Sequence, residues 1–374
     1  MLKAYKYRIY PTNFQKEQLN IYFGCCRFVY NLALETKIAI YDQTKKSISS
    51  FDLMKQMKEL KDTDAPWLKE CPAQSLQASI VNLEKSYSNF FKGSGFPKFK
   101  SKKNKQSIHF PQGVKINFKN NKISLPKLKK VNINLSREFK GKIKTVTVSK
   151  TNTDKYFVSI LIDTENRIPE KVKINEKNTV GVDFGIKKFI TLSDGTFFEN
   201  IKLLRNNLSK LRIEQRKLQR KYIKHSTFQS KNFYKQKLIV SKIHEKIKDQ
   251  REDYLHKIST LIIKKYDTIC LEDLDILAMM KNKLFSSYVG EIGWNIFEKM
   301  LIYKANWYGK NIIYIDRFEP SSKTCSNCGH IKEQLSLKER TYSCDNCGFE
   351  IDRDLNAAIN IKNSGLGYNH LTLT

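Results

Sequence analysis

The sequence predicts a multi-domain α+β protein, and three observations carry this prediction. The chain has 374 residues, which is more than one typical domain needs. Its hydrophobic pattern changes from one strand to a long helical stretch, then to short alternating runs, and last to mixed strands and helices. Two CxxC pairs interrupt that last region, which is typical of a small metal-bound unit inserted into a larger fold.

The first part of the chain predicts a strand followed by helices. Residues 2–10 (LKAYKYRIY) alternate and are rich in β-favouring residues, so they predict a strand that ends at Pro11. Thr12 and Gln15 have the spacing of a capping box that opens a helix, and helical periodicity continues to about residue 92. Short alternating runs follow, from SIHF to YFVSILID. We expect the first strand to join their sheet, with the helical segment inserted into it.

The second part predicts another mixed unit. Residues 178–200 predict two or three strands, and residues 201–265 predict two long helices broken near residue 228. The runs DTICLEDL and NIIYID predict further strands on either side of a helix, WNIFEKMLIYKANWYG. A last helix, DLNAAINIKN, closes this unit.

The charge balance points to a polyanionic partner. Lys and Arg number 68 against 37 acids, so the formal net charge is +31. Nucleic acid is the leading partner, because neutralised phosphates release counterions; an anionic membrane surface is the alternative. No apolar run reaches the roughly 18 residues of a spanning helix. The start of the chain has no apolar signal region, so we expect a cytoplasmic protein.

Basic residues concentrate in two segments. Residues 92–150 carry 17 basic residues and one acid, Glu138, and residues 201–265 carry 19 basic residues and five acids. A solvated face is the ordinary explanation of such runs, but the one-sided balance favours contact with a nucleic-acid backbone. Phe99, Phe110 and Phe118 lie within the first segment, where they suit either base stacking or a sheet core.

The cysteines predict a structural zinc site. Cys325 and Cys328 form one CxxC pair, Cys344 and Cys347 form the other, and 15 residues separate the pairs. This spacing supplies four thiolates to a tetrahedral Zn²⁺ and leaves no open position for water. The remaining cysteines stand in apolar surroundings and are expected to be core thiols: they are Cys25, Cys26, Cys71 and Cys270.

Three acids stand out by their context. Asp183 lies in the apolar run TVGVDFGI, Glu272 in TICLEDL, and Asp354 in IDRDLNAAIN. Taken singly, they suit a turn residue, a salt-bridge partner and an acid at a helix N-terminus. Taken together in so basic a chain, they predict a site for hard divalent ions, where two such ions could activate water and stabilise a leaving oxygen. Sequence alone does not choose between these acids and their neighbours, which are Asp273, Asp275 and Asp352.

Motifs along nearly the whole chain resemble the TnpB family, the RNA-guided DNA endonucleases of bacterial insertion sequences, regarded as ancestral to type V CRISPR effectors. The matching stretches include YRIYPTNFQKEQLN, GFPKFK, VGVDFGIKKFITLSDG, FEPSSKTCSNCG and DRDLNAAINI. The resemblance implies an RNase H-like (RuvC) nuclease core with the zinc ribbon inserted, and a split β-barrel (WED) with an inserted helical recognition domain. It implies a catalytic triad of Asp183, Glu272 and Asp354, two catalytic Mg²⁺ ions with Mn²⁺ as a substitute, and one structural Zn²⁺.

The resemblance also implies domain boundaries. The expected WED barrel covers residues 1–11 and 93–172, and the recognition domain covers residues 12–92. The expected nuclease core covers residues 178–322 and 351–367, with the ribbon at residues 323–350.

Nucleic-acid partners follow from the same resemblance. A guide RNA from the element's end would pair with one strand of a double-stranded DNA target, while the protein reads a short motif beside it. Gln74 and Gln77, in the matching segment PAQSLQ, are the candidate readers, because their amides can bond adenine edges. We expect one chain per RNA and no membrane partner. The competing hypotheses are a guided repressor that does not cut and a DNA-strand transferase.

Overall fold

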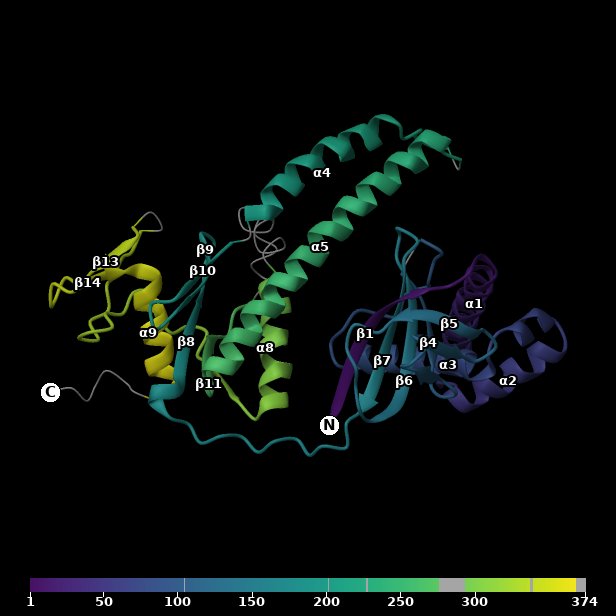
Figure 1. Ribbon diagram of the computed structural model, residues 1–374, viewed down its shortest axis with the longest axis horizontal. Coiled ribbons are helices and arrows are strands. Elements are labelled where there is room, and N and C mark those ends of the chain that lie inside the picture. Colours follow the sequence, from purple (N-terminus) through teal and green to yellow (C-terminus); the bar gives the residue numbers. More distant parts are fainter. Residues whose placement is uncertain (104, 201, 227, 276–292, 337–338, 368–374) are drawn as a thin grey trace. The chain divides into compact units, whose positions relative to one another are not determined.

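The computed structural model describes the chain except for residues 104, 201, 227, 276–292, 337–338 and 368–374. It divides into two compact units, Met1–Arg167 and Ile168 onward, and each is described by itself (Figure 1). None of the described helices combines the length and the apolar character needed to span a lipid bilayer.

The described residues of the first unit form a seven-stranded antiparallel sheet. The strand order is β2-β6-β7-β1-β5-β4-β3. The first strand joins this sheet, as the sequence predicted, and the structure pairs it with β7 on one side and β5 on the other. The bounds are β1 Leu2–Tyr10, β2 Gln106–Phe110, β3 Lys115–Asn117, β4 Lys122–Leu125, β5 Lys129–Asn134, β6 Lys142–Lys150 and β7 Tyr156–Asp163.

Helices enter the chain between β1 and β2 and pack against this sheet. The predicted capping box is present: the Thr12 hydroxyl accepts from the Gln15 amide while the Gln15 side chain accepts from the Thr12 amide. Helix and sheet residues share one core, to which Leu19 and Leu76 of the helices and Ile9 of β1 all belong. The bounds are α1 Asn13–Thr44, α2 Ser50–Asp62, the 3₁₀ helix η1 Pro66–Glu70, and α3 Ala73–Phe91.

The structure separates the three phenylalanines of the basic segment. Phe110 belongs to the core and is 1% exposed. Phe118 packs edge-on against Phe139, with ring centroids 5.2 Å apart. Phe99 remains 54% exposed, so among these three it is the ring most available for base stacking.

The described residues of the second unit form a five-stranded mixed sheet. The strand order is β10-β9-β8-β11-β12; β8, β9 and β10 are antiparallel, while β8, β11 and β12 are parallel. Each strand falls where the sequence predicted one. The bounds are β8 Thr179–Phe184, β9 Lys188–Leu192, β10 Phe197–Glu199, β11 Thr268–Glu272 and β12 Asn311–Ile315.

Helices cover both faces of this sheet (Figure 1). On one face, α5 (Lys231–Lys265) and α8 (Trp294–Tyr308) bury Val182 and Leu271. On the other face, α9 (Arg353–Gly365) packs Ile361 against Cys270. Because successive side chains of a strand point to opposite faces of the sheet, each one faces either the layer of α5 and α8 or the layer of α9.

Two appendages extend from this unit. Helix α4 (Lys202–Arg220) pairs with α5 as a hairpin around Leu211, Val240 and Ile243. The second appendage lies between β12 and α9. It contains the four paired cysteines and the short ribbon of β13 (Thr341–Ser343) and β14 (Glu350–Asp352). The four scattered cysteines are all buried, as predicted.

Candidate active site and metal centre

Two of the predicted acids lie at the carboxyl ends of neighbouring parallel strands. β8 and β11 pair in register up to Leu271 opposite Val182, and Asp183 and Glu272 are the next residue on each strand. Val182 and Leu271 point to the layer of α5 and α8. Because neighbouring side chains alternate between faces, both carboxylates point to the face that α9 covers.

Asp354 reaches the same place from α9, where it lies in the first turn. The helix can sit directly on β8 because residue 181 is glycine: a Cβ at Gly181 would overlap the carbonyl oxygen of Ala358 and the amide of Lys362. This close approach brings the start of α9 to the strand ends. Three acids that are far apart in sequence therefore gather at one edge of the sheet.

Electrostatics show that the three carboxylates are neighbours. Burial raises the pKa of Asp183 well above its ordinary value; the charges of Glu272 and Asp354 raise it further, and Arg353 partly opposes them. Burial also raises the pKa of Glu272, while a hydrogen bond from Ser321 lowers it. Carboxylates gathered at one place favour a bound proton or a cation. Oxygen donors of this kind are suited to a hard divalent ion such as Mg²⁺.

The acid cluster is wider than a closed metal site. Among the described residues, the four paired cysteines are the set whose ligand atoms all lie within 4.8 Å of one another. The three carboxylates do not meet this spacing. Each of them is partly exposed, so an ion in solvent can reach the open cluster.

The neighbouring acids have other contacts. Asp352 is the N-cap of α9, where its Oδ1 accepts from the amides of Asp354 and Leu355, and its Oδ2 lies 2.9 Å from Lys188 Nζ. Through these contacts the Asp352 carboxylate stabilises the N-terminus of α9. Of these two acids, Asp354 raises the pKa of Asp183 more than Asp352 does.

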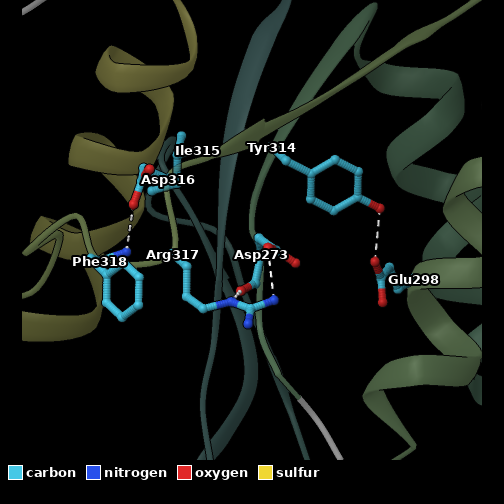
Figure 2. A pocket seen from close by; sticks show the side chains of 7 residues that line it. All are labelled: Asp273, Glu298, Tyr314, Ile315, Asp316, Arg317 and Phe318. Carbon is cyan, nitrogen blue, oxygen red and sulfur yellow. Dashed lines mark hydrogen bonds and ion pairs between the residues drawn. The ribbon is translucent and has the colours of Figure 1, made fainter.

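Two acids that follow Glu272, Asp273 and Asp275, form ion pairs with Arg317, and Figure 2 shows the contact with Asp273. Arg317 Nη2 donates to Asp273 Oδ2 at 2.8 Å and its Nε donates to the Asp273 carbonyl at 3.1 Å, while Nη1 lies 3.8 Å from Asp275 Oδ2. An open cavity of about 840 Å³ adjoins this pair. Phe318 lines this cavity, and 88% of the surface of Phe318 is exposed. The lining residues are Asp273, Glu298, Tyr314, Ile315, Asp316, Arg317 and Phe318.

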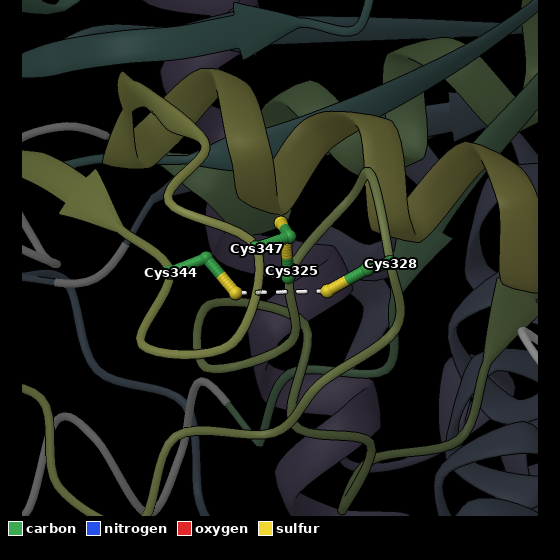
Figure 3. Close-up of side chains that lie close together, drawn as sticks. All are labelled: Cys325, Cys328, Cys344 and Cys347. Carbon is green, nitrogen blue, oxygen red and sulfur yellow. Dashed lines mark hydrogen bonds between the residues drawn. The ribbon is translucent and has the colours of Figure 1, made fainter.

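The four paired cysteines form a compact cluster (Figure 3). The Sγ atoms of Cys325 and Cys347 are 3.8 Å apart, and those of Cys328 and Cys344 are 3.6 Å apart. Four sulfurs at about 2.3 Å from one tetrahedral ion would be separated by about 3.8 Å, so the set fits Zn²⁺.

The turns that present these cysteines have matching backbone geometry. The amide of Gly329 donates to the Cys325 carbonyl, and the amide of Gly348 donates to the Cys344 carbonyl. Both glycines have positive φ, 75° and 70°, a conformation that costs glycine little. The repeated turn explains why a glycine follows each pair.

The two glutamines belong to the first unit, whereas the three candidate acids belong to the second. Gln74 and Gln77 are in the first turns of α3 and are exposed, while Ser75 and Leu76 between them are buried. Exposure leaves their amides available to a partner. Nothing in the first unit itself distinguishes them from ordinary solvated residues.

Sequence reasoning missed three polar residues beside the acids. Ser321 contacts Glu272, and the buried amides of Asn356 and Asn360 bind the loop that carries Ser321. The two asparagines are four residues apart on an otherwise apolar helix face. That spacing is a signal that could have identified them.

Comparisons with known proteins agree with these observations. A family profile described as "Probable transposase" matches residues 159–283, and one described as "Cas12f1-like, TNB domain" matches residues 294–361. A "Helix-turn-helix domain" profile matches residues 1–46. In this chain those residues form β1 and the single long helix α1.

Relatives cover nearly the whole chain. A "Putative RNA-guided DNA endonuclease" of Streptomyces pristinaespiralis is 35% identical, over 97% of this chain and 89% of the relative. A protein of Escherichia coli K12 with the same description is 33% identical, over 97% of this chain and 92% of the relative. A "TnpB-like protein" of Acanthamoeba polyphaga mimivirus is 25% identical, over 98% of this chain and 74% of the relative.

A solved structure shares the fold. The Cas12f1 chain in a complex with single guide RNA and target DNA superposes with a TM-score of 0.57 at 16% identity, covering 97% of this chain and 99% of that one. The mixed α/β architecture is therefore that of the Cas12-type effectors. At the level of sequence, the chain belongs to the TnpB family of RNA-guided DNA endonucleases.

Proposed function

We propose that this chain is an RNA-guided DNA endonuclease of an insertion sequence, and that Asp183, Glu272 and Asp354 form its catalytic centre. The observation that carries the assignment is the meeting of three acids from β8, β11 and α9, close enough for two of them to raise the pKa of the third. The strand order of the second unit supports an RNase H-like core, since three antiparallel strands continue into two parallel ones.

The three carboxylates would hold two Mg²⁺ ions, with Mn²⁺ as a substitute. Bound ions of this kind activate water and stabilise the leaving oxygen in phosphodiester hydrolysis. The chain's own contribution is placement: β8 and β11 hold Asp183 and Glu272 side by side, and Asp352 caps α9 so that Asp354 faces them. The open side of the cluster gives a DNA strand access.

Zn²⁺ would occupy the cysteine cluster as a structural ion, because all four positions are taken by sulfur. We assign the ribbon to residues 323–350 and the nuclease core to residues 178–322 and 351–367. The sheet of the first unit supports a WED barrel made of residues 1–11 and 93–172. The helices between its first two strands support a recognition domain at residues 12–92.

The basic segments would bind a guide RNA, whose pairing with one strand of double-stranded DNA selects the target. Exposed Gln74 and Gln77 are our candidates for reading the motif beside the target, because a side-chain amide can bond an adenine edge bidentately. We propose one chain per RNA, in the cytoplasm.

The catalytic assignment is tested by plasmid cleavage with the purified protein–RNA complex in Mg²⁺. Asp183→Ala is expected to lower the cleavage rate by at least about 100-fold, because a metal site that loses a ligand loses several kcal/mol of transition-state stabilisation. Binding of the same DNA, measured by filter retention, should persist. Persistent cutting by Asp183→Ala at the parent rate would show that the site is elsewhere.

A matched pair tests the choice of the third acid. Asp354→Asn should lose cleavage as Asp183→Ala does. Asp352→Asn keeps a good N-cap residue and should stay within about threefold of the parent. If Asp354→Asn cuts at the parent rate, Asp354 does not have the role assigned to it; an equal loss in both variants would show that Asp352 is needed as well. Target binding without cleavage by the unaltered complex would instead favour a guided repressor.

A further inference from the structure

Glu272 is oriented by Ser321, which lies in the loop that leads from β12 to the paired cysteines. The Ser321 Oγ donates a hydrogen bond of 2.5 Å to Glu272 Oε1. Ser321 lies six residues after the end of β12 and is 6% exposed. A hydroxyl held this rigidly restricts which carboxylate rotamer Glu272 can adopt.

The position of Ser321 is set in turn by α9. Asn360 Nδ2 donates to the carbonyls of Ser321 at 2.8 Å and Thr324 at 2.7 Å. Asn356 Nδ2 also donates to the Thr324 carbonyl, at 2.7 Å. Both asparagines are almost fully buried, at 0% and 3% exposure, so breaking these bonds leaves polar groups without water.

The same loop leads directly into the cysteine cluster. Thr324 precedes Cys325, and the amide of Ser326 donates to Asn356 Oδ1 at 2.9 Å. The amide of Thr324 bonds back to the Pro320 carbonyl at 3.0 Å, which closes a tight turn around Ser321. One hydrogen-bonded segment thus connects a metal-binding cysteine to the Glu272 carboxylate.

We propose that Ser321 is a positioning residue that sets Glu272 for divalent-cation binding, and that the asparagine pair makes this setting depend on a loaded cysteine cluster. The inference rests on the proposed function, because it takes Glu272 as a ligand. Groups that hydrogen-bond a metal ligand commonly change metal affinity or activity by about 10- to 100-fold when removed. The zinc site would therefore tune the catalytic site through a coupling between two ions.

The chain supplies a matched control for loss of a serine–glutamate bond. Ser364 Oγ donates to Glu319 Oε2, also at 2.5 Å, and joins α9 to the same loop. Ser364 is not one of the hydrogen-bond partners given above for Glu272, while the charge of its own partner Glu319 raises the pKa of Glu272. Ser364→Ala therefore keeps both the Ser321–Glu272 bond and the Glu319 charge. Comparing Ser321→Ala with Ser364→Ala separates orientation of Glu272 from general loosening of the loop.

The first experiment measures Mn²⁺ binding to the purified full-length chain by the electron paramagnetic resonance signal of the free ion. Ser321→Ala should bind Mn²⁺ about 10-fold more weakly, with its zinc content equal to the parent's. Ser321→Thr keeps the hydroxyl and should restore binding to within about threefold. Ser364→Ala should bind as the parent does. In cleavage assays, raising Mg²⁺ should restore most of the rate of Ser321→Ala.

The second experiment removes zinc with a chelator, and dialysis then removes the chelator and its bound zinc. The Mn²⁺ titration is repeated on the zinc-free protein. Thiolates favour Zn²⁺ over the hard Mn²⁺ ion, so the emptied cluster does not compete. Zinc removal should weaken Mn²⁺ binding by the parent about as much as Ser321→Ala does. In Ser321→Ala itself, zinc removal should cause little further loss of Mn²⁺ affinity, because coupled changes are not additive.

Each outcome distinguishes the inference from the proposed function. Equal Mn²⁺ binding by the parent and Ser321→Ala overturns the inference, as does an equal loss in Ser364→Ala or an unaltered affinity after zinc removal. If Asp183→Ala nevertheless loses both Mn²⁺ and cleavage, the proposed function stands alone. Parent-like Mn²⁺ binding and cleavage by Asp183→Ala would overturn both.

Discussion

Lys304 is a cation buried between two helices, with 6% of its surface exposed. From α8 its ammonium donates to the carbonyl of His256 and to the hydroxyls of Ser259 and Thr260 on α5, at 2.9, 2.7 and 2.7 Å. Burial lowers the pKa of Lys304 to about 8. The three oxygens compensate the charge only in part, so this lysine makes the stability of the second unit depend on pH.

A pH series tests this. An unfolded lysine has a pKa of about 10.4, so between pH 8 and that value the unfolded chain binds more protons than the folded chain. The free energy of unfolding therefore rises with pH across this window. Relative to Lys304→Met, the parent should gain about 2 kcal/mol between pH 7.5 and 9.5, at 1.36 kcal/mol per pKa unit.

Urea denaturation provides the measurement. A Trp67→Phe background leaves Trp294 and Trp307, both on α8, to report on the second unit. Parallel pH profiles for parent and variant would show that Lys304 does not titrate in this range.

At the same scale, the sequence singled out the acids as candidates, but it did not show which of them caps a helix and which lies beside Asp183 and Glu272. Asp352 and Asp354 are alike in sequence; what separates them is that Asp352 precedes the first turn of α9 and caps it, an outcome of where the helix begins. Ser321 was unrecognised because its role depends on a loop folding back onto β11. Contacts between distant segments leave no periodic trace in the sequence.

Among the elements, β8 and α9 make the contact on which the site depends. Gly181→Ala would place a methyl group against the backbone of Ala358 and Lys362, and backbone cannot move aside as a flexible side chain does. The variant should lose about 1–3 kcal/mol of stability and most of its cleavage, since α9 carries Asp354. Gly95→Ala, with nothing within 4 Å of the added atom, is the control. Calorimetry of both variants gives the comparison, and an unchanged melting temperature in Gly181→Ala would contradict the packing.

Most elements could be predicted because their patterns are local. The capping box at Thr12, the apolar alternation of β7 and the strand NIIYID each carry their own signal, and each is present. The return of alternation after the helices led us to expect that the first strand joins the later sheet, and it does; its pairing with β7 in particular was not predicted. The face on which α9 lies was not predictable in this way, because it depends on a glycine in a strand far away in sequence.

For the whole molecule, the excess of 31 positive charges should govern association with nucleic acid. Each neutralised phosphate contributes about 0.7–0.9 to the slope of log affinity against log salt concentration. If the chain contacts six or more phosphates, its affinity for guide RNA should fall by about 10³-fold or more between 50 and 200 mM salt. Fluorescence anisotropy with labelled guide RNA measures the slope; a value shallower than about 3 would mean that the charge is not engaged by the RNA.

Composition predicted the class of partner at this scale, because charge is a sum over residues and needs no fold. It could not assign individual lysines. Lys188 pairs with Asp352 and Lys310 with Asp267, so both already hold structural partners. A structure is needed to distinguish lysines with such ion pairs from lysines that remain available to bind phosphate.

The order of the acids along the chain has a consequence for protein synthesis. Asp183 and Glu272 leave the ribosome before the four paired cysteines do, and Asp354 follows those cysteines on α9. On the proposed assignment, a nascent or prematurely terminated polypeptide that stops short of α9 would carry two acids and no working centre. A cell that translates beside its own chromosome would then be exposed to nuclease activity only after the ribbon has been made.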